Sequence, residues 1–333
     1  MAKKNHHYIP QTYLKQWEDS TKRVWLYNFR ERTVSHRNKD SIFKEDYLYS
    51  LTFRELQLLT PEQREIFAEP LKPFHVFLGS NELTPQEIVE DLQHYDEFII
   101  RKKDGTHIKQ KHKAALLNEM LNRKHPEIED RYSKSVESFW NDVVNFFEKF
   151  RTMVVAGNII LPEAVQFAEY VNKLLEFMLS IYTRNPYNML RSIERVKKRE
   201  HLEIDNITAR TVFEKIQLLY LNGERKLFDT SKYDIHLFFT TTEHPFITTD
   251  NPVVIRGIEM EGAEFKGLFW FPISPYILIS LSEKMKKNHM DIKYYQILGE
   301  MTKELNSLLI DNAIECFILP EKIEDIGFSF VQN

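Results

Sequence analysis

The strongest constraint on the fold is a change of hydrophobic period at about residue 235. Between about residues 61 and 224, apolar side chains recur at helical spacing, which predicts a large helical middle. From residue 235 onward, short apolar and β-branched segments are separated by Gly and Pro turns, which predicts an antiparallel strand meander. A chain with separate helical and strand-rich stretches is typical of the α+β class.

Two amphipathic helices dominate the predicted helical middle. Apolar side chains at helical spacing mark residues 136–150 and 164–182, and this spacing is typical of helices that bury one face in a core. Pro186 predicts a break directly after the second helix. Further helices are predicted to start at the Thr-Pro pairs of residues 60–61 and 84–85, and to cover residues 191–199 and 208–221.

Strands are predicted at both ends of the chain. An N-terminal arm over residues 6–17 combines an extended segment with one helical turn, and a β-hairpin follows over residues 24–36. The meander is followed by a closing helix at about 294–314 and a last strand at 316–319. Without a repeat or a clear linker, we predict one intertwined domain over residues 1–333. Its helical insertion covers about 61–224, and its strand-rich part joins 235–333 with 1–60.

Composition excludes several classes of function. The chain has only 9 Gly and contains neither G-x-G-x-x-G nor a Walker A motif, so we expect no nucleotide cofactor. Cys316 is the only cysteine, which excludes an intrachain disulfide and a cysteine-based zinc cluster. No apolar run approaches the ~20 residues that span a bilayer. The first residues lack an apolar signal core. We therefore expect a reduced cytoplasmic protein with no membrane partner.

The charge of the chain gives no global reason to expect nucleic acid, because the net charge is −4. A local exception is the basic run over residues 101–113, which is rich in Lys and Arg. Charge runs usually face water, which predicts a solvated turn between helices. The alternative interpretation is a patch that binds nucleic acid.

Five motifs occur in a fixed order along almost the whole chain. They are H-H-Y-I-P-Q-T-Y-L-K-Q-W at 6–17, R-N-P at 184–186, T-T-D-N-P-V at 248–253, F-P-I-S-P at 271–275, and Asn306 with N-A at 312–313. Together they resemble the domain of unknown function 4238 family. Asn185 and the exit at residues 17–18 depart from the family's more frequent residues. The family name carries no activity, so the resemblance marks residues without implying a reaction.

The turn at residues 248–253 concentrates two hydroxyls, one carboxylate and one amide between apolar strands. Asp250 and Asn251 are either turn-forming residues or functional groups. Together with the imidazoles of His6 and His7 and the guanidinium of Arg184, Asp250 forms the candidate catalytic set. Residues predicted to bind substrate or to support this set are Gln11, Thr249, Asn251, Asn306 and Asn312.

These residues support two hypotheses about function. The first is a hydrolase, a nuclease or phosphodiesterase, in which His6 or His7 transfers protons and Arg184 stabilises phosphate charge. Asp250 then orients the histidine, or binds a divalent metal together with it. A superficial likeness of the His6–His7 opening to His-Asn-His nuclease cores belongs to the same class. The second hypothesis is a non-enzymatic binding or regulatory module in which the same motifs are structural.

Overall fold

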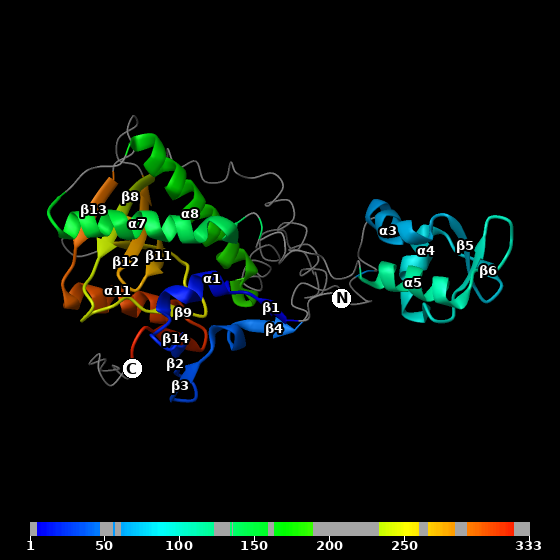
Figure 1. The fold of residues 1–333 in the computed structure, drawn as a ribbon, viewed down its shortest axis with the longest axis horizontal. Helices are drawn as coiled ribbons and strands as arrows, with labels where there is room; N and C mark the ends of the chain where they lie inside the picture. Colours follow the sequence, from blue (N-terminus) through cyan, green and yellow to red (C-terminus); the bar gives the residue numbers. More distant parts are fainter. Residues whose placement is uncertain are drawn as a thin grey trace. The chain divides into compact units, whose positions relative to one another are not determined.

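The computed structural model describes residues 5–46, 56, 61–122, 134, 136–158, 163–188, 233–259, 266–283 and 292–322. The chain forms two compact units (Figure 1). The larger comprises residues 7–44, 129–189 and 220–333, and the smaller comprises residues 1–6, 45–128 and 190–219. Helices and largely antiparallel sheets are both present, which confirms the predicted α+β class. The predicted single domain over residues 1–333 stays a prediction, and the helices predicted at 191–199 and 208–221 lie outside the described residues.

The N-terminal arm has the predicted form. It contains β1 (Asn5–His7), α1 (Gln11–Leu14) and the 3-10 helix η1 (Lys15–Trp17). The predicted hairpin follows as β2 (Val24–Asn28) and β3 (Thr33–Arg37). The next elements are η2 (Lys39–Ser41) and β4 (Lys44–Asp46), and β4 pairs with β1.

The described residues of the larger unit form two sheets of four and five strands. The five-stranded sheet has the order β10-β11-β12-β8-β13. Its strands are β8 (Tyr233–Phe239), β10 (Val254–Glu259), β11 (Lys266–Ser274), β12 (Ile277–Glu283) and β13 (Ile292–Gln296). The four-stranded sheet has the order β3-β2-β14-β9, with β9 (Thr248–Thr249) and β14 (Cys316–Leu319). The strand β14 therefore lies between the N-terminal hairpin and β9, which begins the 248–253 motif.

Helices cover both faces of the five-stranded sheet (Figure 1). They are η5 (Glu137–Phe139), α7 (Trp140–Val155), α8 (Ala164–Arg184) and α11 (Gly299–Asn312). Neighbouring residues of β8 point to opposite faces. Phe239 meets Phe150 of α7 edge to face, whereas Phe238 packs in one hydrophobic cluster with Leu305 and Leu309 of α11. The aromatic stripes predicted as core are buried, and Trp140 of α7 stacks on Phe177 of α8 at 3.9 Å between ring centroids.

The closing helix starts later than the sequence pattern predicts. We predicted a helix from about residue 294, but residues 292–296 form β13, which pairs in parallel with β8. Tyr294 and Tyr295 favour a strand, because aromatic side chains pack well on a pleated surface. The helix begins only at Gly299 and buries Leu305 and Leu309. The predicted break after the other long helix is confirmed, because α8 ends at Arg184.

The smaller unit combines helices with a sheet that the helical periodicity did not predict. Its elements are α3 (Pro61–Ala68), η3 (Glu69–Leu71), β5 (Phe74–Leu78), β6 (Asn81–Glu82), α4 (Pro85–Glu90), η4 (Leu92–His94), β7 (Ile99–Lys102) and α5 (Gln110–Asn122). The strand order is β6-β5-β7. The helix start predicted at residues 84–85 is confirmed, and Thr84 and Glu87 form a capping box at the start of α4. Strands of five residues or fewer are too short to show a clear alternation in sequence.

No helix in the described part of the chain is both long enough and apolar enough to cross a bilayer.

Candidate functional site

The carboxylate of Asp250 binds the backbone at the start of β14. Its Oδ1 accepts a hydrogen bond from the N–H of Ile314 at 2.8 Å. Its Oδ2 accepts from the N–H groups of Glu315 at 2.7 Å and Cys316 at 3.0 Å. The backbone N–H of Asp250 donates to the carbonyl of Cys316 at 3.2 Å. Asp250 is only 4% exposed, so this buried carboxylate fixes the connection between α11 and β14 to the end of β9.

Burial also changes the pKa values of Asp250 and of its neighbour Cys316. Burial raises the pKa of the Asp250 carboxyl, and the three backbone hydrogen bonds act in the opposite direction. Burial, with a smaller contribution from Asp250, raises the pKa of the neighbouring Cys316 thiol to about 12. Cys316 is therefore a protonated thiol at neutral pH, and a thiol in this state is a poor nucleophile.

Four asparagines extend the network from Asp250 to the ends of two helices. Asn185 Nδ2 donates to the Asp250 carbonyl at 2.6 Å, and its Oδ1 caps the short helical turn at residues 186–188. The side-chain amides of Asn188 and Asn251 bond to each other at 2.8 and 3.3 Å. Asn251 Nδ2 donates to the carbonyl of Asn312, whose Nδ2 returns a 2.7 Å bond to the Asn251 carbonyl. These amides connect the end of α8 and the end of α11 to one turn.

The remaining supporting residues have local hydrogen-bonding roles. Thr249 Oγ1 accepts from the N–H of Asn251 at 3.1 Å. Asn306, 2% exposed on α11, accepts from the N–H of Ile247 and donates to the carbonyl of Pro245, both at 3.0 Å. A buried amide that bonds to backbone groups of a neighbouring segment holds that segment in register. Both residues therefore fix the backbone around the 248–253 motif.

Arg184 forms a buried ion pair at the C-terminal end of α8. Its side chain is 1% exposed and Nη1 donates to Glu137 Oε1 at 2.5 Å. Nη2 donates to the backbone carbonyl of His7 at 2.6 Å. The guanidinium thus joins α8 to η5 and to the N-terminal arm. The structure brings Arg184 to the backbone of His7 rather than to its imidazole.

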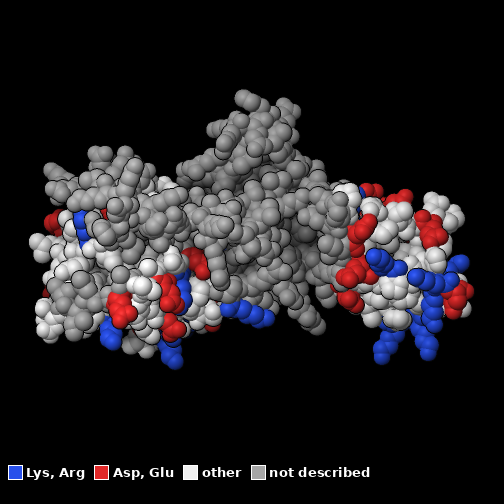
Figure 2. All heavy atoms as spheres, turned by 90° about the horizontal axis from the view of Figure 1, so that it is seen from above, with Lys and Arg blue, Asp and Glu red and all other residues white. Residues whose placement is uncertain are grey.

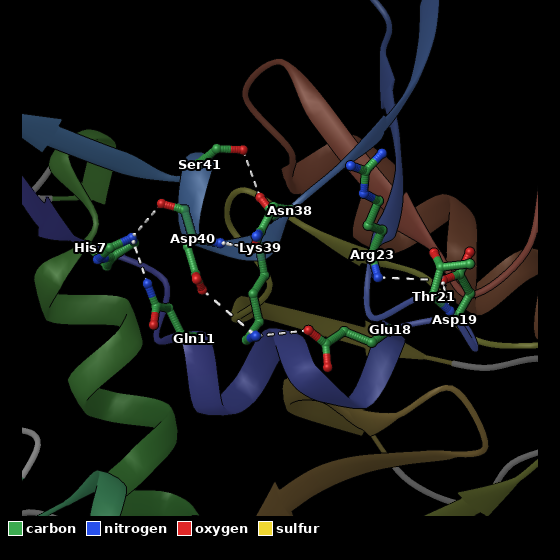
Figure 3. A network of polar contacts seen from close by, with 10 residues as sticks. All are labelled: His7, Gln11, Glu18, Asp19, Thr21, Arg23, Asn38, Lys39, Asp40 and Ser41. Carbon is green, nitrogen blue, oxygen red and sulfur yellow. Dashed lines mark hydrogen bonds and ion pairs between the residues drawn. The ribbon is translucent and has the colours of Figure 1, made fainter.

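His6 and His7 are both buried, at 4% and 6% exposure. Figure 3 shows the imidazole of His7 between the amide of Gln11 and the backbone of Asp40. His7 Nε2 lies 3.1 Å from Gln11 Nε2 and 3.3 Å from the Asp40 carbonyl. One ring nitrogen cannot accept from Gln11 and donate to Asp40 in the same tautomer. Hydrogen bonds of the Asp250 carboxylate go to backbone N–H groups and not to either imidazole.

Several residues outside the predicted set tie the N-terminal arm to the 248–253 motif. The hydroxyl of Tyr13 lies 2.8 Å from Thr248 Oγ1 and donates to the Pro272 carbonyl at 2.9 Å. Trp17 Nε1 donates to the carbonyl of Phe246 at 3.1 Å. Tyr13 and Trp17 lie in the predicted arm over residues 6–17, and their hydrogen-bond partners were not predicted. These contacts join three of the five motif stretches, at residues 6–17, 248–253 and 271–275, and the shared presence of these motifs was the signal available in the sequence.

Metal ligation and the His-Asn-His alternative gain no support from side-chain placement. In the parts of the chain that the structure describes, no group of three or more His, Cys, Asp or Glu side chains is arranged to hold a metal ion. That alternative needs a further asparagine and histidine, for which the β-hairpin offers Asn28 and His36, and both have local partners. Asn28 Oδ1 accepts from the N–H of Glu31 at 2.9 Å, and His36 pairs with Asp19 at 2.8 Å.

A buried histidine that sequence reasoning missed lies in the five-stranded sheet. His236 on β8 is 1% exposed. Its Nε2 lies 2.8 Å from Ser282 Oγ and its Nδ1 lies 3.2 Å from the hydroxyl of Tyr295. Burial, followed by the charge of Lys293, lowers the pKa of His236 to about 4. The signal in sequence was a single histidine within an apolar strand.

This histidine predicts a loss of stability in mild acid. An unfolded imidazole binds a proton below about pH 6.5, whereas folded His236 resists protonation down to about pH 4. Protons therefore favour the unfolded chain between about pH 6.5 and pH 4. Outside this window His236 does not change how the free energy of unfolding depends on pH. We expect His236 to remove up to about 3 kcal/mol of unfolding free energy across the window.

Urea unfolding at several pH values between about 7.5 and 4 measures this loss. The variant His236→Gln should lack this part of the pH dependence, whereas His94→Gln, at an exposed position of the smaller unit, should retain it. Parallel pH profiles for the wild type and His236→Gln contradict the prediction, whatever the stability of the variant at neutral pH.

The basic run of the smaller unit lies on β7, on the turn that follows and on the first turn of α5. Four of its side chains are exposed and form no ion pair with any described residue: Lys102, Lys103, Lys109 and Lys111. The others have partners: Lys113 donates to the carbonyl of Asp96 at 2.9 Å, and Arg101 lies over the ring of Phe77 at 5.2 Å. The first turn of α5 contains no acidic residue. Cations there oppose the helix dipole, so these lysines do not serve helix stability.

Charge is separated within the smaller unit. Residues 61–97 contain nine Asp or Glu and two Lys or Arg, whereas residues 98–122 contain two Asp or Glu and six Lys or Arg. Figure 2 shows Lys and Arg side chains projecting together along the lower edge of this unit. The net charge of −4 for the whole chain does not reveal this local excess of positive charge.

A family model described as a protein of unknown function (DUF4238) matches residues 5–319. The match covers all five motifs and confirms the resemblance drawn from them. No curated protein and no solved structure matches the chain.

Proposed function

The chain belongs to the DUF4238 family, and we propose that it is a non-catalytic protein that binds nucleic acid through its smaller unit. The observation that carries the proposal is the group of four exposed lysines at residues 102–111 that have no ion-pair partner among the described residues. Cations that stabilise a fold are usually paired or dispersed, whereas a cluster without acidic partners attracts a polyanion. Phosphate contacts by Lys and Arg supply most of the affinity of such complexes.

The larger unit has a structural role in this proposal. Hydrogen bonds within the protein engage the carboxylate of Asp250, the guanidinium of Arg184 and the side-chain amides of Asn251, Asn306 and Asn312. These contacts support the hypothesis that the family motifs hold the fold. We also propose a cytoplasmic location, which the single reduced and buried Cys316 supports.

Oligonucleotide binding, measured by fluorescence anisotropy between about 50 and 200 mM salt, tests the proposal. Replacement of Lys102, Lys103, Lys109 and Lys111 by Gln should weaken binding about 100-fold. It should also lower the slope of log affinity against log salt by about 3, because each phosphate contact on a single strand contributes about 0.7.

A matched variant controls for the change in net charge. Replacing four exposed lysines of the larger unit, Lys15, Lys22, Lys44 and Lys149, by Gln removes the same charge and should leave both the affinity and the salt slope close to wild type. Absence of salt-dependent binding to any oligonucleotide overturns the proposal. An equal loss in both variants overturns it as well, because the binding is then not located in the smaller unit.

The hydrolase hypothesis stays a prediction with its own test. Labelled oligonucleotides are incubated with the protein, with and without a divalent cation, and the products are separated by size. Cleavage that His7→Gln and Asp250→Asn both abolish, in variants that remain folded, supports catalysis by the predicted set and contradicts a non-catalytic protein.

A further inference from the structure

The sheet of the smaller unit buries only one of its faces in the unit's hydrophobic core. Val76 and Ile100 belong to that core, with Phe74 and Leu78 packed against it, and each of the helices α3, α4 and α5 contributes two further core residues. Successive side chains of a strand point to opposite faces. The second face therefore carries the alternate residues of β5 and β7, which are His75, Phe77, Ile99 and Arg101. All four are partly exposed.

An arginine and an aromatic ring lie together on this second face. The register pairs His75 with Arg101 and Phe77 with Ile99, which makes Phe77 and Arg101 diagonal neighbours. The guanidinium carbon of Arg101 lies 5.2 Å from the centroid of the Phe77 ring. Arg101 Nε is shielded from water, yet it has no hydrogen-bond acceptor among the described residues. The face thus presents an aromatic ring and a guanidinium plane.

The cations of the basic run border this face. His107 forms an isolated antiparallel bridge with Arg101, so the ladder continues beyond β7 on the side opposite β5. Lys102, at the end of β7, alternates to the other face of the sheet, Lys103 follows in the turn, and Lys109 and Lys111 follow the bridge. Two carboxylates are also present: Glu82 of β6 pairs with His75 at 2.5 Å, and Asp104 lies in the turn after Lys103, where its charge interacts with that of Lys102. The balance of charge around Arg101 and His107 remains positive.

We propose that this face binds single-stranded nucleic acid. An unpaired base stacks against the pair formed by the Phe77 ring and the Arg101 guanidinium that lies over it. The phosphates pass along the four lysines of the proposed function, on which this inference rests. Every base offers a flat π-surface, so stacking on an aromatic side chain is tolerant of sequence. Single strands expose their bases for such contacts, as in RNA recognition on open sheets. A duplex holds its bases in the stack and offers only its backbone.

Anisotropy with labelled oligo(dT), oligo(U) and a hairpin duplex of matched length tests the inference, and the first two probes separate DNA from RNA as the ligand. We expect tighter binding of at least one single strand than of the duplex. Phe77→Leu keeps apolar volume but removes the ring, and we expect it to weaken single-strand binding about tenfold without changing the salt slope. Phe77→Tyr should retain wild-type affinity. Tyr187→Ala, at an exposed aromatic residue of the larger unit, serves as the control.

The outcomes separate this inference from the proposed function. If the four-lysine variant loses binding while Phe77→Leu binds like the wild type, the stacking face is overturned and the proposed function stands. Equal affinity for single strands and duplex also overturns the stacking face alone. If no oligonucleotide binds, both are overturned. Arg101→Gln provides a second readout that does not depend on the ring, and it should lower both the affinity and the salt slope.

Discussion

Replacing Asp250 by Ala is expected to lower the free energy of unfolding by about 4 kcal/mol. The substitution leaves three backbone N–H groups without their acceptor, and an unsatisfied buried donor costs about 1–3 kcal/mol. Ile314 and Glu315 are only partly buried, so water satisfies part of what is lost. Asp250→Asn should lie between the wild type and Asp250→Ala, because its amide keeps one acceptor oxygen.

Urea unfolding followed by circular dichroism measures this effect. Asp311→Ala is the matched control, because Asp311 is an exposed carboxylate near the end of the same helix that leads to Ile314. It should change the free energy of unfolding by less than about 0.5 kcal/mol. A stable Asp250→Ala protein contradicts the structural role, and it favours a carboxylate kept for chemistry.

Replacing Arg184 by Met is expected to cost about 3–5 kcal/mol. Removing one partner of a buried ion pair leaves the other charge without compensation. Glu137, whose side chain is 13% exposed, then has no cation, and the carbonyl of His7 loses the hydrogen bond from Nη2. Met retains the volume of the aliphatic stem, so the loss reports the charge and the hydrogen bonds.

The double variant Arg184→Met with Glu137→Gln should recover most of that loss, because no charge is then left unpaired. Lys173→Met is the control on the same helix. Lys173 pairs with Glu169 at 2.7 Å, but both side chains are far more exposed than Arg184. An exposed pair contributes about 0.2–1 kcal/mol. A stable Arg184→Met protein that no longer binds oligonucleotides contradicts the structural role and supports a phosphate-binding arginine.

If Asp250→Ala and Arg184→Met are both destabilised as expected, the family motifs are the residues that hold distant segments of this fold together. The N-terminal arm, the end of α8, the turn after β9 and the end of α11 are far apart in sequence, yet they share one buried polar network. Buried polar groups need partners of defined geometry. A network of this kind restricts the residues allowed at each position without any need for a substrate.

The network also shows why candidate catalytic residues could be found from sequence while their roles could not. The sequence identified Asp250, Asn251 and Arg184 through the polar character of their motifs. Whether Asp250 faces a ligand or the backbone of Ile314 depends on where β14 lies, and that strand is more than sixty residues away. His236 and Ser282, paired at 2.8 Å, could not be matched in advance, because strand register determines which side chains meet.

The sequence by itself determined the elements whose causes are local. Side-chain spacing placed the amphipathic helices α7 and α8, Pro186 marked the break after Arg184, and Thr84 with Pro85 marked the start of α4. Only the tertiary structure decided the rest. Long-range strand pairing made β13 a strand, placed β14 beside β9, and set Arg101 over Phe77. These pairings depend on burial and hydrogen bonding between segments that are distant in the chain. The local spacing of residues therefore does not predict them.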